Sequence, residues 1–185
     1  PVPALPRVGD FWLGLDNGVL TLRYRTLGEV VTWNGQNTLR DTISGDVKFS
    51  ECPLGTFKGQ WIHVAVVLAD DTSNPDGSMQ VIFAVEVDGT QYTVTKQVPG
   101  KRNAASNPGN LIIGVNPDVP GPSLNLQIDE IRLWNSARNV EQISSNRHFI
   151  LNSASAGWNS LGAYYRFDDG GATAENAKYS FAGAA

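Results

Sequence analysis

Short segments that alternate apolar and polar residues recur along the chain, and a turn signal follows each of them. Residues 11–15 precede Asn17-Gly18, and residues 19–24 then alternate. The pair Asn-Gly readily adopts the positive φ angles that tight hairpins need. The same arrangement recurs with residues 29–33 before Asn34-Gly35 and with residues 79–87 before Asp88-Gly89. The sequence therefore predicts a series of antiparallel hairpins.

A longer segment indicates how these hairpins assemble. Residues 61–68 are largely apolar on both alternating faces, which is typical of a central strand in stacked sheets. The 185 residues include 19 glycines and 10 prolines, and 17% of them are charged, which fits many short strands joined by tight turns. A chain of this length suits one all-β domain. We expect this domain over residues 11–185, preceded by a proline-rich segment over residues 1–10.

The segment QIDEIRLWNSAR, residues 127–138, joins a strand pattern to a helix signal. Residues 128–134 alternate, and a short polar stretch then leads to Asn139. An asparagine at this position can cap the first amides of a helix over residues 140–146, where Val140 and Ile143 share one face. This is the one helix that we expect.

Five motifs follow one another in an ordered series. They are WIHVA at 61–65, VEVDG at 85–89, LIIG at 111–114, IDEIRLWN at 128–135 and LGAYYRFDDG at 161–170. In this order and at these spacings the chain resembles the laminin-G-like, concanavalin A-like jelly rolls. The resemblance implies an all-β sandwich of two antiparallel sheets with one short helix. The first strands usual in that family are not recognisable, so we expect either a fragment without its N-terminal strands or a divergent member.

The resemblance also implies a function, because the family consists mostly of glycan-binding and adhesion modules. We expect a non-catalytic carbohydrate-binding or adhesion module of a secreted, multi-modular protein, whose partner is a carbohydrate such as a cell-surface glycan, or another protein domain. The alternative is a structural spacer or protein–protein interaction domain. A glycoside hydrolase is a weaker third interpretation.

Tryptophans in loops are the candidate sugar-binding residues, since such modules stack sugar rings on aromatic side chains. Trp33 precedes the Asn34-Gly35 turn, and Trp158 lies in a polar loop. Their polar neighbours complete the predicted ligand site: Asn34, Gln36 and Asn159. The alternative is that both tryptophans plug the ends of the sandwich. Trp61 and Trp134 lie within strand patterns and are expected in or at the core.

Carboxylates offer little support for catalysis. Glu86 and Asp88 superficially resemble the acidic strand of concanavalin-like hydrolases, which needs two carboxylates about 5 to 5.5 Å apart. The third position is Gln91, and Asp88-Gly89 is a turn signal that would break such a strand. No Gly-x-Ser-x-Gly motif or phosphate-binding loop is present. We therefore expect no enzyme.

The family resemblance further implies a structural calcium ion, with Asp129 as one ligand. Calcium takes six to eight oxygen ligands. The companion loop of the family corresponds only weakly to residues 175–178, so a carboxylate satisfied by backbone amides or by Arg132 is the alternative.

Charge and hydropathy exclude two partner classes. The net charge of −4, with scattered basic residues, argues against nucleic acid. The longest apolar run, residues 62–69, is far shorter than the roughly 20 residues of a membrane-spanning helix. We expect no membrane insertion.

Overall fold

The computed structural model describes residues 11–16, 19–27, 30–33, 36–39, 42–49, 59–70, 78–100, 113, 127–168, 170 and 174–180. The chain divides into two compact units, Pro1–Pro122 and Ser123–Ala185. That the chain forms a single domain over residues 11–185 stays a prediction.

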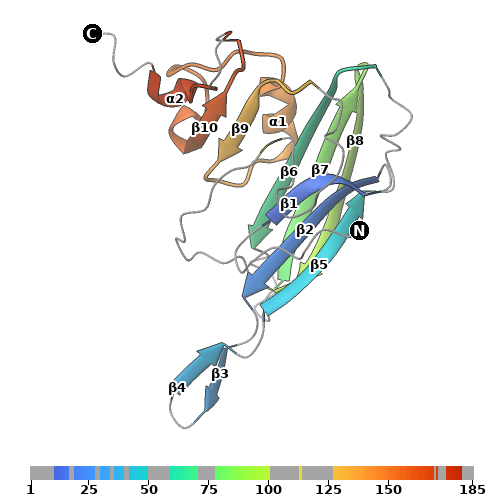
Figure 1. Ribbon diagram of the computed structural model, residues 1–185, viewed down its shortest axis with the longest axis vertical. Coiled ribbons are helices and arrows are strands. Elements are labelled where there is room, and N and C mark those ends of the chain that lie inside the picture. Colours follow the sequence, from blue (N-terminus) through green and yellow to red (C-terminus); the bar gives the residue numbers. More distant parts are fainter. Residues whose placement is uncertain are drawn as a thin grey trace. The chain divides into compact units, whose positions relative to one another are not determined.

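The first unit contains a sheet with the strand order β1-β2-β5 (Figure 1). Its antiparallel strands are β1 (Phe11–Asp16), β2 (Val19–Leu27) and β5 (Thr42–Phe49). Asp16 pairs with Val19, so the β1–β2 hairpin has the predicted two-residue connection. A separate hairpin joins β3 (Val30–Trp33) to β4 (Gln36–Leu39), and its pairing of Trp33 with Gln36 confirms the second predicted hairpin.

The second sheet of this unit has the order β6-β7-β8 and is also antiparallel. Its strands are β6 (Ile62–Asp70), β7 (Ser78–Val87) and β8 (Thr90–Pro99). Between β7 and β8, Asp88 and Gly89 have φ angles of 48° and 75°. Two successive positive φ angles are what a type I′ hairpin turn requires, so the third predicted hairpin is confirmed.

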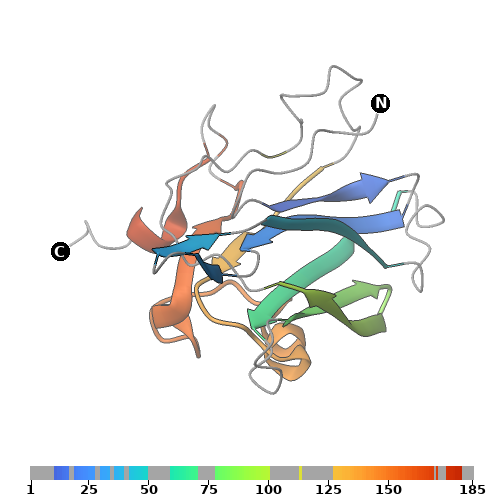
Figure 2. The same cartoon turned by 90° about the horizontal axis from the view of Figure 1, so that it is seen from below.

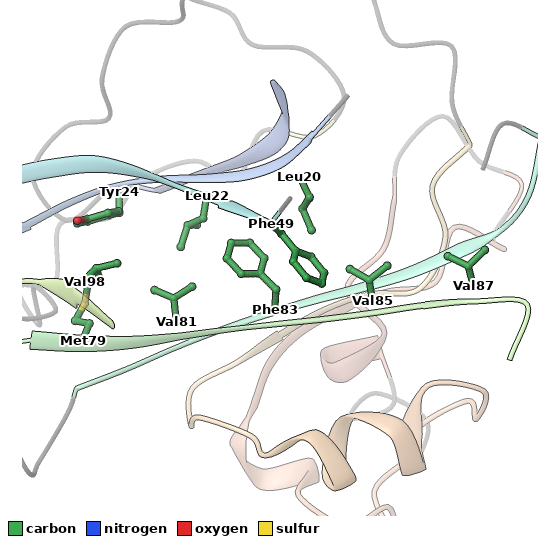
Figure 3. Close-up of a cluster of buried hydrophobic side chains, with 10 residues drawn as sticks. All are labelled: Leu20, Leu22, Tyr24, Phe49, Met79, Val81, Phe83, Val85, Val87 and Val98. Atoms are coloured by element: carbon green, nitrogen blue, oxygen red, sulfur yellow. The ribbon is translucent and has the colours of Figure 1, made fainter. Parts of the chain in front are cut away.

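The two sheets pack face to face as two layers (Figure 2). Alternate residues of β2 and β7 supply most of the buried side chains between the layers (Figure 3): Leu20, Leu22, Tyr24, Met79, Val81, Phe83, Val85 and Val87. Phe49 of β5 and Phe83 of β7 stack across the two sheets, with ring centroids 5.4 Å apart and an interplanar angle of 21°. Burial of each such side chain contributes about 1.5–3 kcal/mol. The prediction of an all-β sandwich is confirmed.

The second unit contains a two-stranded antiparallel sheet and short helices. Its elements are β9 (Ile131–Trp134), α1 (Val140–Asn146), the 3₁₀ turn η2 (Trp158–Ser160), β10 (Leu161–Tyr165) and α2 (Ala177–Ser180). Helix α1 has the predicted bounds and the predicted cap at Asn139, which forms a capping box with Gln142. The prediction of a single helix misses the four-residue α2. Within the described residues, none of the helices has the length and apolar content needed to cross a membrane.

Strand β9 is shorter than the predicted strand over residues 128–134. Glu130 has a φ angle of 55°, in the left-handed region that side chains other than glycine seldom occupy. This angle interrupts the extended backbone just before Ile131. The prediction that the alternating strand begins at residue 128 is therefore wrong.

Candidate functional site

Trp61 exposes 65% of its surface at the beginning of β6. Ile62, the next residue, forms the first pair of the β6–β7 ladder, opposite Val87. Trp61 thus lies one residue outside the ladder, at the sheet end where β7 turns into β8. The expectation that Trp61 lies in or at the core is wrong, because the central strand begins one residue later than its apolar pattern suggests.

Polar side chains lie at the same end of the sheet. Asp88 and Gln91 are exposed, and His63 lies two residues from Trp61. Glu86 pairs with His63 on one side and with Gln91 on the other, so these three residues form a row across the sheet. We call Trp61, His63, Asp88 and Gln91 the Trp61 surface. It combines a flat aromatic ring with amide, imidazole and carboxylate groups that can hydrogen-bond hydroxyls.

Glu86 has a structural contact of its own in this row. Its side chain is 8% exposed, and its Oε1 accepts a hydrogen bond from the Gly89 amide at 2.8 Å. The carboxylate therefore closes the β7–β8 turn whose first residue is Asp88. The prediction that Asp88-Gly89 is a turn rather than part of a catalytic strand is confirmed.

The predicted ligand residues of the β3–β4 hairpin are only partly described. Trp33 and Gln36 are cross-strand partners, so the backbone brings them together at the tip of the hairpin. Asn34 lies outside the described residues. A shared ligand-binding role for these three residues stays a prediction.

Trp158 lies in η2 and is half-buried. It packs against the second unit's core of Leu151, Leu161 and Tyr164, and its carbonyl accepts a hydrogen bond from Lys178 Nζ at 2.9 Å. This packing agrees with the alternative in which the tryptophan is a plug. Asn159 is exposed beside it, and a ligand role for the pair stays a prediction.

The carboxylate of Glu130 is held by two groups of the β9–β10 sheet. Its Oε2 accepts from Arg132 Nη2 at 2.6 Å and from the Tyr164 hydroxyl at 2.5 Å. Burial raises the pKa of the Tyr164 hydroxyl, and the hydrogen bond to Glu130 raises that pKa further, because the phenolate would be desolvated and would face a carboxylate. We call Glu130, Arg132 and Tyr164 the Glu130 network.

Arg132 also connects β9 to the segment after it. Its Nη1 donates to the Asn146 carbonyl at 2.7 Å, and its Nη2 donates to the Phe149 carbonyl at 2.6 Å. Asn146 is the last residue of α1, and Phe149 lies in the loop that follows. One guanidinium thus fixes the end of the helix against the strand, which explains why an arginine stands in the IDEIRLWN motif.

A second arginine of the motif region is buried without a carboxylate among its described contacts. Arg138 is 8% exposed, and its guanidinium lies 3.9 Å from the ring centroid of Trp134. Burial lowers the pKa of Arg138, and the charge of Arg132 lowers it further. Trp134 is half-buried against the second core, as predicted.

A cavity of about 300 Å³ lies within the second unit. Three arginines and three carboxylates line it: Arg132, Arg147, Arg166, Asp129, Glu130 and Asp168. Arg166 Nη2 donates to Asp168, and Arg166 Nε lies 4.0 Å from Glu130 Oε1. Ion pairs therefore join four of these residues: Arg132, Arg166, Glu130 and Asp168.

Side chains expected near a calcium ion at Asp129 already have partners within the protein. The Asp129 carboxylate accepts from the Glu130 amide at 2.9 Å, and Glu130 is engaged by Arg132 and Tyr164. In the companion segment, Asn176 Oδ1 accepts from the Tyr164 amide at 3.0 Å. In the described part of the chain, no three or more His, Cys, Asp or Glu side chains are placed so that they could hold a metal ion together. Calcium binding stays a prediction.

Sequence reasoning missed Trp61 and Arg166. A signal for Trp61 is present, since Gly59 lies two residues upstream and has a φ angle of 76°, which marks a turn directly before the strand. Arg166 lies in a motif that resembled the closing strand, but β10 ends at Tyr165. Its position on a cavity wall depends on contacts with residues far away in the sequence.

A comparison with known families gives one match. The family model described as the concanavalin A-like lectin/glucanases superfamily matches residues 13–144. No curated protein and no solved structure matches the chain.

Proposed function

Because the chain belongs to the concanavalin A-like lectin/glucanases superfamily, we propose that it is a non-catalytic carbohydrate-binding module of a secreted, multi-modular protein. Superfamily membership supports a carbohydrate-binding or adhesion-type module in general. Since the superfamily contains both lectins and glucanases, the choice between binding and catalysis depends on the residues of this chain.

The observation that carries the proposal is the exposure of Trp61. A tryptophan that is 65% exposed at the end of a sheet loses much of the hydrophobic stabilisation that burial would give. Its ring offers an apolar face for a sugar ring, while Asp88 and Gln91 at the same sheet end offer partners for hydroxyl groups. The glycan in this proposal stacks on Trp61 and is oriented by these polar neighbours.

Three carboxylates of the described residues have partners within the fold, which supports a binding role rather than hydrolysis. Retaining hydrolysis needs one carboxylate as nucleophile and another as acid. Glu86 is bound to the Gly89 amide, Glu130 is bound to Arg132, and Asp168 accepts from Arg166. Each of these carboxylates has a structural partner.

A glycan array tests the proposal. The full chain is screened once with calcium and once with EDTA, and the strongest binder is then titrated against three variants. Trp61→Ala should weaken binding about tenfold or more, whereas Trp61→Tyr should keep much of it because an aromatic face remains. Phe149→Ala is the matched control, since it removes an equally exposed aromatic ring (64%) from the other unit. Loss of binding in EDTA would establish calcium dependence.

Binding that survives Trp61→Ala would reject the Trp61 surface. A blank array in both conditions would reject the carbohydrate-binding function itself. Hydrolysis of the bound oligosaccharide by the wild-type chain would overturn the non-catalytic role.

One observation favours the second function, a protein-interaction module. Phe11, Leu13 and Leu15 of β1 are 55%, 39% and 41% exposed. They pair with Tyr24, Leu22 and Leu20, which are core residues, so the core-facing layer of the sheet continues into an exposed apolar row. A blank glycan array combined with a dimer in analytical ultracentrifugation would favour this function.

A further inference from the structure

The cavity of the second unit is not explained by the proposed glycan site. It lies entirely among residues 129–168, away in sequence from the Trp61 surface, and its volume of about 300 Å³ is at the lower end for small-molecule sites. The charges in its wall decide what it can bind.

Arg166 is a wall residue whose terminal nitrogen Nη1 makes no hydrogen bond within the described residues. A guanidinium carries five N–H donors. In the described part of the chain, only its Nη2 forms a hydrogen bond, to Asp168, and its Nε is buried without a hydrogen-bond partner. The side chain is 25% exposed and Nε is buried, so the donors left for a ligand are those of the terminal nitrogens. Arg132, by contrast, already uses both terminal nitrogens.

The carboxylates of the wall do not create a matching need for a cation. Glu130 Oε2 has two donors, and Asp129 Oδ1 accepts from an amide. Asp168 is 56% exposed, so water can solvate its second oxygen. Arg166 Nη1 is left without an acceptor among the described residues, and a carboxylate is the acceptor whose geometry and charge suit a guanidinium.

Apolar surface adjoins this charged wall. Phe149 and Ile150 also line the cavity, and they are 64% and 60% exposed. Two consecutive large apolar side chains exposed at a cavity are typical of a ligand-binding rim. We propose that this cavity binds a carboxylate that carries an apolar group, with the carboxylate on Arg166 and the apolar group on Phe149 and Ile150. The glycan site is not required for this binding.

Benzoate is a suitable probe, and benzamide is its matched neutral control. Titration of the ¹⁵N-labelled full chain should shift the amide signals of residues 147–150 and 166–168 with benzoate and leave them unchanged with benzamide. Glucuronate, a carboxylate without an apolar group, should bind more weakly than benzoate. Equal shifts with benzoate and benzamide, or benzoate shifts confined to other residues, would overturn the proposal.

Variants test the two halves of the site separately. Arg166→Gln should weaken benzoate binding about tenfold to a hundredfold, because it removes a charge-assisted hydrogen bond. Asp168→Asn should tighten benzoate binding, because the Asp168 carboxylate, which competes with benzoate for Arg166, is lost. Phe149→Ala should weaken it, whereas Trp61→Ala should leave it unchanged. Thermal melting checks the folding of each variant. A folded Arg166→Gln protein with wild-type affinity would show that the guanidinium is not the anchor.

Discussion

Replacement of Arg132 by methionine tests whether the Glu130 network stabilises the second unit. The substitution keeps much of the side-chain volume but removes hydrogen bonds to Glu130, Asn146 and Phe149, at 2.6, 2.7 and 2.6 Å. The removal of one partner from a buried ion pair typically costs about 3–5 kcal/mol. Arg132 is 11% exposed, but Glu130 is 30% exposed and keeps its hydrogen bond from the Tyr164 hydroxyl. The loss of stability should therefore lie at the lower end of this range. We expect a loss of about 3 kcal/mol, or roughly 6–12 °C in melting temperature.

Urea unfolding followed by circular dichroism measures this loss, and hydrogen exchange locates it. Amides of β9, β10 and α1 should lose protection, whereas those of β6–β8 should keep it. Arg166→Met is the matched control: it removes the same type of charge from the same cavity, but its hydrogen-bond partner Asp168 is 56% exposed and its other carboxylate, Glu130, lies 4.0 Å away. The control should cost less than about 1 kcal/mol. If both variants lose the same small amount, the hydrogen bonds of Arg132 do not stabilise the fold.

Two further predictions concern the same unit. Because the pKa of Tyr164 is raised, the folded protein keeps this proton at a pH where the unfolded chain, with a tyrosine pKa of about 10, loses it. The contribution of Tyr164 to the free energy of unfolding should therefore be fully present below pH about 10 and should fall as the pH rises through the raised pKa. Urea titrations should show that Tyr164→Phe lacks this loss of stability at alkaline pH. Gly157→Ala should destabilise by more than about 1 kcal/mol, because Gly157 has a φ angle of 84° and a new Cβ would lie 2.5 Å from Arg138 Nη1. Gly89→Ala has a φ angle of 75° and no atom within 4 Å of the new Cβ, so it measures only the cost of the positive φ angle. Equal losses of stability in the two variants would exclude a contribution from Arg138.

The strands and turns of the first unit were predictable because their signals are local. The hairpin turn at Asp88-Gly89 depends on the φ angles of the turn residues themselves, and the β1–β2 hairpin pairs Asp16 with Val19. In the second unit, the helix α1 depends on the cap that Asn139 supplies. The break before β9 was not predictable. The left-handed backbone of Glu130 accompanies a carboxylate bound to Tyr164, a residue 34 positions away, and no local pattern contains that contact.

The exposure of the candidate site residues was also hard to predict from the neighbouring sequence. Trp61 was assigned to the core from its apolar strand, yet it precedes the first pair of the ladder and is exposed. Trp158 was a candidate platform because its neighbours are polar, but Lys178 of α2 and the core residue Leu161 contact it. Exposure is decided by what packs against a residue, and the contact with Lys178, 20 positions away, is not visible in the neighbouring sequence.

The motif residues that identify the family contact other residues of the same fold. In the IDEIRLWN motif, Glu130 and Arg132 bind each other, and Trp134 packs against Arg138 and the second core. A side chain with such partners has little capacity left for a ligand, since a new contact would have to replace a buried hydrogen bond. The motif therefore identifies the sandwich without identifying what it binds. The two proposed sites instead use side chains with exposed surface, Trp61 in one unit and Phe149 beside Arg166 in the other.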